Sequence, residues 1–436
     1  MKKKTEKILL IGNGAREHAI AESVVRFGYK LYGFMSAKNP GIVKLCREYK
    51  TGNILDAESA VHFARTMNAD AVIIGPEAPL ETGVSDKILE NGIVCLSPTK
   101  SLARIETNKE FARNLMKEHN IRAYPKFEIF KKGENAEMFK FIDNLQDVAV
   151  KPVGLTGGKG VRVTGKQLNN AKEAKKYAGE ILEKDRIVLI EEKLEGEEFT
   201  LQVFCDGENL APSPLVQDHK SAYENDVGPN TGGMGSYSDK NFMLPFVTQT
   251  DYEDALGNLK KVINVLKKDY GRYIGILYGQ FIATKDGVRI IEFNARLGDP
   301  EAMNVLPLIK EDWIEKILDK KLSSGLKFEN RASVCKYLVP AGYPENPVQT
   351  EIFVDDSKFK DNSKIYYASV YEEGGKILST HSRAIAVLGI ADTIEEAEKI
   401  AENSTKFVKG NLEHRKDIGT RELINKRIEF MKKIRK

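Results

Sequence analysis

The sequence has few of the residues that build disulfide frameworks and soft-metal sites. It contains four cysteines and six histidines among 436 residues. The cysteines (Cys46, Cys95, Cys205 and Cys335) form no C-x-x-C pair, and the histidines show no metal-binding spacing. A disulfide-stabilised secreted protein and a zinc-finger type of site are therefore disfavoured. We expect reduced, mostly buried thiols in a cytoplasmic protein.

Long hydrophobic runs and an excess of charge of one sign are missing as well. No apolar run approaches the roughly 20 residues that span a bilayer, and the run at residues 8–11 is too short for a signal peptide. The 67 basic and 63 acidic residues give a net charge of +4, which makes no general case for nucleic-acid binding. The basic segment 426–436 predicts a solvated terminal helix. We expect neither a membrane nor nucleic acid as a partner.

The residues that are present indicate a multidomain protein of α/β and α+β type. A chain of 436 residues is too long for one hydrophobic core. Residues 7–18 predict a buried strand, a glycine-rich turn and a helix start, which is how a doubly wound domain begins. Residues 30–35, 71–75 and 93–96 predict further strands of that domain. Strands at 334–340 and 383–389, followed by a helix, predict a C-terminal α+β domain.

The first domain offers a candidate substrate site where two strands end. In open α/β sheets, ligands lie beyond the carboxyl ends of the strands. The candidate substrate-binding residues there are Gly12, Asn13, Gly14, Glu17, Pro76 and Glu77. The third glycine of G-x-G-x-x-G is missing, so a small phosphorylated substrate is favoured over a dinucleotide. A turn that needs glycine only for its backbone shape is the alternative.

A second glycine-rich stretch predicts a phosphate-binding loop. Residues 147–153 contain a predicted strand whose last residue is Lys151, and four glycines follow within residues 154–160. Their bare amides can surround phosphate oxygens, with Lys151 and Lys159 as point charges. The Walker A spacing is absent, and a flexible glycine hairpin is the alternative. Lys109, near the start of a predicted helix, is either a nucleotide contact or a solvated charge. Glu191 and Glu198, at strand ends, are either nucleotide acceptors or exposed acids.

A third stretch predicts a cation site. Residues 288–293 form a predicted strand, on which Glu292 and Asn294 share one face because side chains two apart do so. Mg²⁺ prefers oxygen ligands of this kind, with phosphates completing the shell. If a three-residue loop at 285–287 joins this strand to 276–283, Gln280 lies opposite Glu292. A two-residue loop would place Gly279 there. We expect the three-residue loop and Gln280 as a third ligand; a polar strand end facing water is the alternative.

Taken together, these stretches resemble the ATP-grasp ligases, and more closely the phosphoribosylamine–glycine ligase (glycinamide ribonucleotide synthetase) family. The resemblance covers nearly the whole chain in order, at residues 11–18, 75–80, 151–160, 217–220, 228–235, 292–301 and 415–419. The glycine loop is generic to ATP-grasp proteins and here departs from the family's K-A-D-G-L-A-A-G-K-G. The stretches Q-D-H-K, G-P-N-T-G-G-M-G and N-x-R-x-G-D-P-E are specific.

The resemblance implies a fold and an activity. It implies a pre-ATP-grasp N-terminal domain (1–106), an ATP-grasp domain (107–329) with a mobile lid at about 123–189, and a C-terminal domain (330–436). The implied reaction joins glycine to 5-phosphoribosylamine with ATP, through glycyl phosphate, in de novo purine biosynthesis. We expect a monomer or weak homodimer. Another ATP-grasp activity, such as a carboxylase subunit, and a non-catalytic nucleotide sensor are the alternatives.

The resemblance also implies roles for individual residues. Mg²⁺ or Mn²⁺ would be held by Glu292 and Asn294. The residues that would hold ATP are Lys109, Lys151, Glu191, Leu194 through its backbone, and Glu198. The residues around glycine and the phosphorylated amine would be Asp218, Lys220, Arg296 and Asp299, and the catalytic residues Arg296, Lys151 and Asp218. Arg415 and Asp417 are expected either in an interdomain contact or on the surface, and the stretch 228–236 as a loop by its composition.

Overall fold

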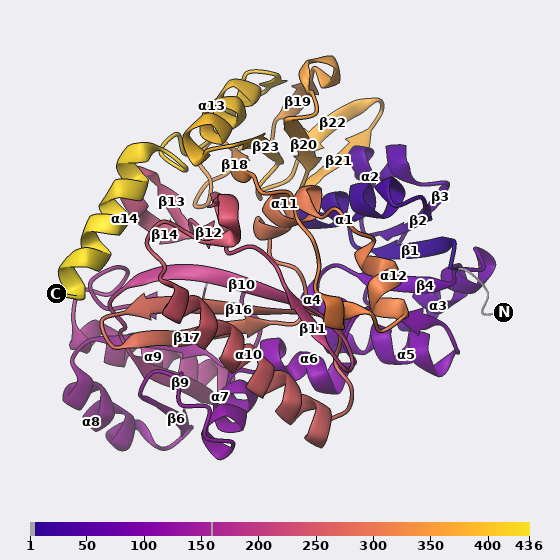
Figure 1. The fold of residues 1–436 in the computed structure, drawn as a ribbon. Coiled ribbons are helices and arrows are strands. Elements are labelled where there is room, and N and C mark those ends of the chain that lie inside the picture. Colours follow the sequence, from indigo (N-terminus) through magenta and orange to yellow (C-terminus); the bar gives the residue numbers. More distant parts are fainter. Residues whose placement is uncertain (1–4, 158–159) are drawn as a thin grey trace.

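The computed structural model describes residues 5–157 and 160–436 of the chain. Figure 1 shows three regions, each built around its own sheet: a central antiparallel sheet, the N-terminal region at its right and the C-terminal region above it, with the N-terminal and C-terminal regions in contact. Among the described residues, no helix is long and apolar enough to cross a membrane. Lys159 and Gly158 of the predicted phosphate loop lie outside the described residues.

The N-terminal region is a doubly wound parallel sheet. Its five strands have the order β3 (Glu48–Thr51), β2 (Lys30–Met35), β1 (Lys7–Ile11), β4 (Ala71–Ile74), β5 (Val94–Cys95). The helices around it are α1 (Ala15–Arg26), α2 (Pro40–Leu45), α3 (Ala57–Thr66), α4 (Glu77–Thr82), α5 (Val84–Glu90) and α6 (Lys100–Thr107). Strand β1 is buried from Ile8 onward, as its unbroken apolar run requires in a sheet covered on both faces. The predicted strands of this region are confirmed.

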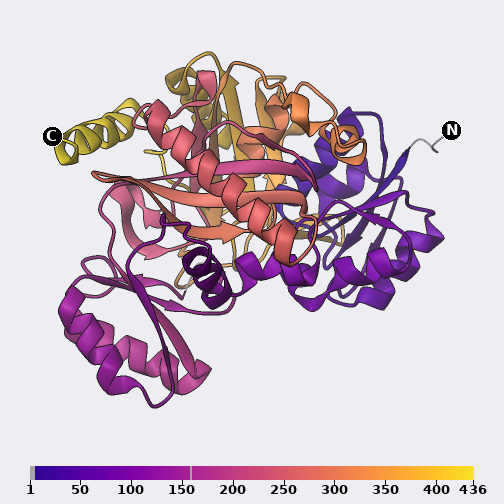
Figure 2. The same ribbon diagram turned by 60° about the horizontal axis from the view of Figure 1, so that its bottom comes forward.

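The central sheet is antiparallel, in the order β11 (Leu210–Pro212), β10 (Glu197–Asp206), β16 (Ile274–Thr284), β17 (Gly287–Asn294). Helices α7 (Lys109–Glu118) and α10 (Gln249–Asp269) accompany it. A separate lobe carries the sheet β6 (Phe127–Lys131), β9 (Ile187–Glu192), β7 (Val148–Pro152), β8 (Arg162–Val163), with α8 (Asn135–Leu145) and α9 (Ala171–Asp185). Figure 2 shows this lobe standing apart from the rest. It also has its own apolar core, whereas one continuous core joins the other regions.

Two strands in the main sheet of the C-terminal region, β12 (Gln217–Asp218) and β15 (Gly235–Ser238), come from the middle of the chain. The main sheet runs β12, β15, β18 (Ala332–Pro340), β23 (Ile385–Ala391), β20 (Ser363–Tyr367), and β25 (Leu412–Glu413) also pairs with β18. A smaller sheet runs β21 (Val370–Glu373), β22 (Lys376–Ser379), β19 (Glu351–Val354), β24 (Val408–Lys409). The helices of the C-terminal region are α13 (Ile394–Thr405) and α14 (Arg421–Ile434). Two short helices precede this region along the chain: α11 (Glu301–Val305), which contacts α1, and α12 (Trp313–Leu318), which contacts β10.

The prediction of a loop over 228–236 is wrong at both ends of that stretch. Residues Val227–Asn230 form β14, which pairs with β13 (Ser221–Tyr223), and β15 begins at Gly235. Only the short segment between β14 and β15 is a loop, as its turn-forming composition predicts. The pairing of β15 with β18 ties this segment to the C-terminal region.

The hairpin of β16 and β17 reaches its predicted pairing by a different route. Gln280 lies opposite Glu292, as expected, but the turn is a two-residue one in which Thr284 pairs with Gly287. A β-bulge then shifts the register: Phe281 pairs with Ile290, whereas Gln280 pairs with Glu292, so Ile291 is the extra residue. The expected three-residue loop is therefore wrong, and the bulge supplies the one-residue shift that brings Gln280 opposite Glu292.

Candidate active site

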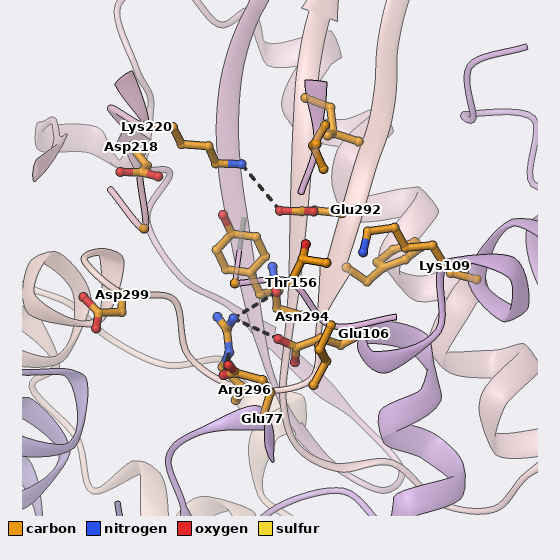
Figure 3. A pocket seen from close by; sticks show the side chains of 18 of the residues that line it. Glu77, Glu106, Lys109, Thr156, Asp218, Lys220, Glu292, Asn294, Arg296 and Asp299 are labelled. Atoms are coloured by element: carbon orange, nitrogen blue, oxygen red, sulfur yellow. Dashed lines mark hydrogen bonds and ion pairs between the residues drawn. The ribbon is translucent and has the colours of Figure 1, made fainter. Parts of the chain in front are cut away.

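Two connected cavities of about 260 and 250 Å³ lie where the three regions and the lid lobe meet. The residues that line both cavities are Lys151, Val161, Asp218, Lys220, Ile291 and Glu292. The carboxyl end of β17 therefore faces both cavities. Figure 3 shows the first cavity, with Glu292, Asn294 and Arg296 following one another along this strand and the turn after it.

Glu292 is the ionised carboxylate of the site. Its Oε1 lies 3.4 Å from Lys220 Nζ, and one third of the side chain is exposed to the cavity. Burial opposes its charge, but the ammonium groups of Lys220, Lys109 and Lys151 outweigh burial and lower the pKa of Glu292 to about 2. Asn294 Oδ1 accepts a hydrogen bond from Arg296 Nη2 at 3.0 Å. A charged carboxylate beside an amide oxygen fits a hard divalent cation.

Gln280 does not offer its oxygen to the cavity. The residue is 1% exposed, and its Oε1 accepts a hydrogen bond from the hydroxyl of Tyr278. Its Nε2 donates to Glu198 Oε2 at 2.7 Å. In this structure the Gln280 oxygen accepts from Tyr278, just as the Asn294 oxygen accepts from Arg296, so Gln280 as a third metal ligand stays a prediction. Among the described residues, no group of three or more His, Cys, Asp or Glu could hold a metal ion, so other oxygens would have to complete the shell.

Three cations, Lys151, Arg113 and Lys109, lie near the buried carboxylate of Glu191. Glu191 Oε2 lies 2.6 Å from Lys151 Nζ, and Glu191 Oε1 lies 2.5 Å from Arg113 Nε. Burial raises the pKa of Glu191, and the two cations lower it to a net value below the ordinary range. Lys109 Nζ donates to the carbonyl of Gly154 at 3.0 Å. Glu191 therefore orients Lys151 in this structure, whereas a free nucleotide acceptor was expected.

The second cavity combines an apolar slot with acidic ends. Its apolar lining is Pro125, Ala149, Val161, Val163, Leu194, Ile282 and Ile291. Glu198 lies at one end, with a little over a third of its side chain exposed and one oxygen held by Gln280. A flat aromatic base fits an apolar slot, and hydroxyl groups fit a half-exposed carboxylate. Leu194 is one of the residues that line this slot. The expected contact between ATP and the backbone of Leu194 stays a prediction.

Arg296 connects the central sheet with the N-terminal region. Its guanidinium lies 2.8 Å from Glu106 Oε1 and 3.4 Å from Glu77 Oε2. Burial raises the pKa of Glu77, but Arg296 and Arg16 lower it to about 2. Glu77 is therefore charged and lines the first cavity, as the position at the end of β4 predicts.

The remaining N-terminal candidates line neither of these two cavities. Glu17 is 3% exposed, and its Oε2 accepts a hydrogen bond from the backbone of Gly14 at 2.6 Å. A Cβ added at Gly12 would lie 2.7 Å from Pro76 Cδ. Asn13 Oδ1 accepts from the hydroxyl of Ser36 at 2.5 Å. In this structure the turn is held by its own residues, and Glu17 caps α1, so a phosphate at this turn stays a prediction.

Asp218, Lys220 and Asp299 surround the opposite end of the first cavity (Figure 3). Among the described residues, Asp218 Oδ1 is buried without a hydrogen-bond partner. Burial and the nearby Glu301 raise the pKa of Asp218 well above its usual range. Asp299 Oδ2 lies 3.2 Å from Arg383 of the C-terminal region. An ammonium group close to Asp218 would lower the pKa of this carboxyl again.

Models of one protein family match all three regions. The phosphoribosylglycinamide synthetase models match residues 6–106 (N domain), 107–302 (ATP-grasp domain) and 333–421 (C domain). The chain belongs to this family. It is similar to phosphoribosylamine–glycine ligase of Methanosarcina acetivorans, with 51% identity over 438 residues and 98% of each chain covered. The ligase of Methanocaldococcus jannaschii is 52% identical over 445 residues, covering 99% of this chain and 100% of the relative.

Solved structures agree with the fold of the phosphoribosylglycinamide synthetase family. Phosphoribosylamine–glycine ligase of Thermotoga maritima matches with a TM-score of 0.79 and 26% identity, covering 94% of this chain and 99% of that chain. The biotin carboxylase domain of a Hydrogenobacter thermophilus carboxylase matches with a TM-score of 0.72 and 18% identity, covering 99% and 94%. The second likeness shows the shared fold alone. The predicted fold class is confirmed.

The phosphoribosylglycinamide synthetase fold also brings residues to the site that the sequence motifs did not single out. Arg113 lies on α7 and is 3% exposed. Glu106 ends α6, and its Oε2 accepts from the backbone of Ala295 at 2.6 Å. Arg383 donates to the carbonyls of Gly232 and Gly233 at 2.7 and 3.0 Å. The local pattern gave no signal for Arg113, because residues two apart on a helix, such as Phe111 and Arg113, do not share a face.

Proposed function

We propose that this protein joins glycine to 5-phosphoribosylamine with ATP, producing glycinamide ribonucleotide, ADP and phosphate in purine biosynthesis. The observation that carries the proposal is the match of all three domains and of nearly the whole chain, at about half identity, to phosphoribosylamine–glycine ligases. The cavity supports it, because an ionised carboxylate, three lysines and an apolar slot face one another there.

The proposed reaction has two steps. A glycine carboxylate oxygen attacks the γ-phosphorus of ATP, so a P–O bond forms, the bond to ADP breaks, and glycyl phosphate results. The amine nitrogen of phosphoribosylamine then attacks the glycyl carbonyl; the new C–N bond replaces the C–O bond, and phosphate leaves with the amine proton. Neither step needs a covalent link to the protein, so catalysis rests on positioning and charge neutralisation.

We assign the residues of the site to separate roles in binding ATP, glycine, the amine and the metal ion. Lys109 and Lys151 would hold phosphates, with Lys159 expected beside them, and Leu194 and Glu198 would hold the base and ribose. Asp218 would bind the glycine ammonium, and Lys220, Arg296 and Asp299 would orient the carboxylate and the amine. Glu292 and Asn294 would hold Mg²⁺ or Mn²⁺, which neutralises phosphate charge when bound. Glu77 would face the phosphoribosyl group.

We further propose the division into residues 1–106, 107–329 and 330–436, with a mobile lid over about 123–189. The separate apolar core of the lid lobe supports the lid, because few apolar contacts then resist its movement. Cys95, Cys205 and Cys335 are buried free thiols, which agrees with a cytoplasmic location. That location and a monomeric or weakly dimeric state stay predictions.

One assay tests the proposed function. Purified protein is given ATP, magnesium and glycine with ribose 5-phosphate and ammonia, which generate the amine in solution, and ADP and phosphate are measured. We expect ADP release that requires both glycine and the amine. Release with bicarbonate in place of glycine would indicate a carboxylase, and ATP binding without amine-dependent release would indicate a nucleotide sensor. A titration with NADH without a spectral change would exclude the dinucleotide alternative.

A further inference from the structure

The C-terminal helix α14 lies almost wholly outside the family models, the last of which ends at residue 421. Figure 1 shows it leaving the C-terminal region and running down the side of the molecule toward the ends of β10, β16 and β17. Two arginines attach it to the central region. Arg427 lies within the helix and Arg435 directly after it.

Arg427 lies at the second cavity, which we call the nucleotide cavity because ATP is proposed to bind there. Its Nη1 lies 3.3 Å from Glu197 Oε2, its Nη2 contacts Asp226, and 14% of the side chain is exposed. All three residues line the second cavity, the one with the apolar slot. Glu197 directly precedes Glu198 on β10, the residue proposed to receive the ribose. The charge that holds this end of β10 therefore comes from a helix that the three domain matches leave out.

This corner of the cavity also has unused hydrogen-bonding capacity. Among the described residues, Arg427 Nε and both ring nitrogens of His219 are buried without a hydrogen-bond partner. His219 is 2% exposed and lines the same cavity. Buried polar atoms are rarely left without partners, so this corner is suited to polar groups of a ligand and its water.

Arg435 provides a natural comparison. Its guanidinium lies 2.8 Å from Asp251 and donates to the carbonyl of Thr284 at 3.1 Å. Neither Arg435 nor Asp251 lines either cavity. The two arginines therefore attach the same helix, one at the nucleotide cavity and the other away from it.

We propose that α14 forms a wall of the nucleotide cavity and that Arg427 is a positioning residue for ATP, acting through Glu197 on the ribose end of β10. The proposal rests on the proposed use of ATP at this site. It assigns a role in nucleotide binding to a segment beyond the matched domains. Arg427 takes no part in bond making, so its loss should change affinity and leave the chemical step intact.

The test compares Arg427→Met, Arg427→Lys and Arg435→Met in the full-length protein. ADP binding with magnesium is measured by calorimetry, KM for ATP and kcat by the ligase assay, and Tm by calorimetric melting. We expect Arg427→Met to weaken ADP binding and raise KM for ATP by roughly 3- to 30-fold, the range of coupling through packed networks. The kcat at saturating ATP and the KM for glycine should change less than about twofold. Arg427→Lys should recover part of the affinity, because it keeps the charge.

Arg435→Met should lower Tm without changing ADP affinity. Equal loss of affinity in Arg435→Met and Arg427→Met would overturn the proposal, since it would reduce Arg427 to a general attachment of the helix. Unchanged ADP affinity in a folded Arg427→Met would overturn it as well. Because ADP binding is measured without the ligase reaction, failure of the proposed function would be recognised separately, as wild-type protein that binds ADP but forms no product.

Discussion

At the scale of single residues, charge decides what the site can hold. Glu292 stays ionised although it lies in a cavity wall, because Lys220, Lys109 and Lys151 lower its pKa to about 2. The three lysines repel one another, and the carboxylate of Glu292 offsets part of their charge. A triphosphate entering the site would therefore contact three ammonium groups and one carboxylate that could itself hold a cation. If the proposed function holds, a divalent cation beside Glu292 would offset part of the triphosphate charge that the lysines leave.

Glu292→Gln tests this balance with minimal change in shape. We expect turnover to fall by roughly 100-fold or more, because an amide cannot supply the charge that holds the cation. Tm should fall somewhat, because the lysines that lower the pKa of Glu292 also stabilise its charged form in the folded protein. Activity is measured over a range of magnesium concentrations, with the exposed Glu253→Gln as control. Full activity of Glu292→Gln in magnesium buffer would reject the metal assignment.

At the scale of elements, one bulge and one buried arginine set the spacing of the site. The bulge at Ile291 frees a carbonyl, which accepts a hydrogen bond from Arg113 Nη2 at 2.6 Å. The same guanidinium holds Glu191, which in turn holds Lys151. Arg113 therefore connects the strand that carries Glu292 to the lysine expected to bind phosphate. Helix α7, strand β17 and the lid sheet meet at this one side chain.

Arg113→Met should disturb the cation and the nucleotide together. We expect the magnesium concentration for half-maximal activity and the KM for ATP both to rise, by roughly 3- to 30-fold. Arg113→Lys should show a smaller rise, because an ammonium group can keep the contact with Glu191. The control is Arg104→Met, which removes an exposed guanidinium stacked on Phe111, 4.2 Å from the ring centre. If only the KM for ATP rises and the magnesium concentration for half-maximal activity stays the same, the proposed connection between Arg113 and Glu292 is contradicted.

At the scale of the whole molecule, a neutral histidine lies between the N-terminal and C-terminal regions. His18 on α1 is buried, and its Nδ1 accepts a hydrogen bond from the backbone of Tyr367 at 3.0 Å. Burial lowers the pKa of His18 to about 4. A protonated ring could not accept that hydrogen bond. The interface therefore depends on the neutral form of His18.

This interface predicts an acid-sensitive stability. The folded pKa lies below the unfolded value, so the unfolded chain binds the extra proton first and stability is lost as pH falls from about 6.5 toward 4. The loss between pH 7 and pH 5 should be about 2 kcal/mol. His18→Gln keeps an acceptor that does not titrate, so its Tm should fall less over this range than that of wild type. The exposed His62→Gln serves as control, and an equal fall in all three proteins would exclude His18 as the cause.

Local pattern was sufficient for part of the site. The two-residue period of a strand placed Glu292 and Asn294 on one face, and burial of unbroken apolar runs placed the N-terminal strands. Other parts depended on contacts that no local pattern reports. The bulge at Ile291 was not predicted, and neither was the contact of its carbonyl with Arg113 on α7 or the hydrogen bond from Tyr278 to the oxygen of Gln280. The interdomain position expected as one alternative for Arg415 is confirmed, since it is 2% exposed and contacts Asp226 at 3.1 Å.

The amino-acid sequence by itself determined the elements, the order of the motifs and the chemical groups available at the site, because strand period and glycine content act over a few residues. Only the tertiary structure decided which of these groups face the cavity. Arg113, Arg383 and Arg427 belong to three distant elements, and each is brought in by packing across regions. Burial and nearby charges then set the pKa values of Glu292, Glu77 and Asp218, since the pKa of a side chain depends on what surrounds it in space and not only on its neighbours along the chain.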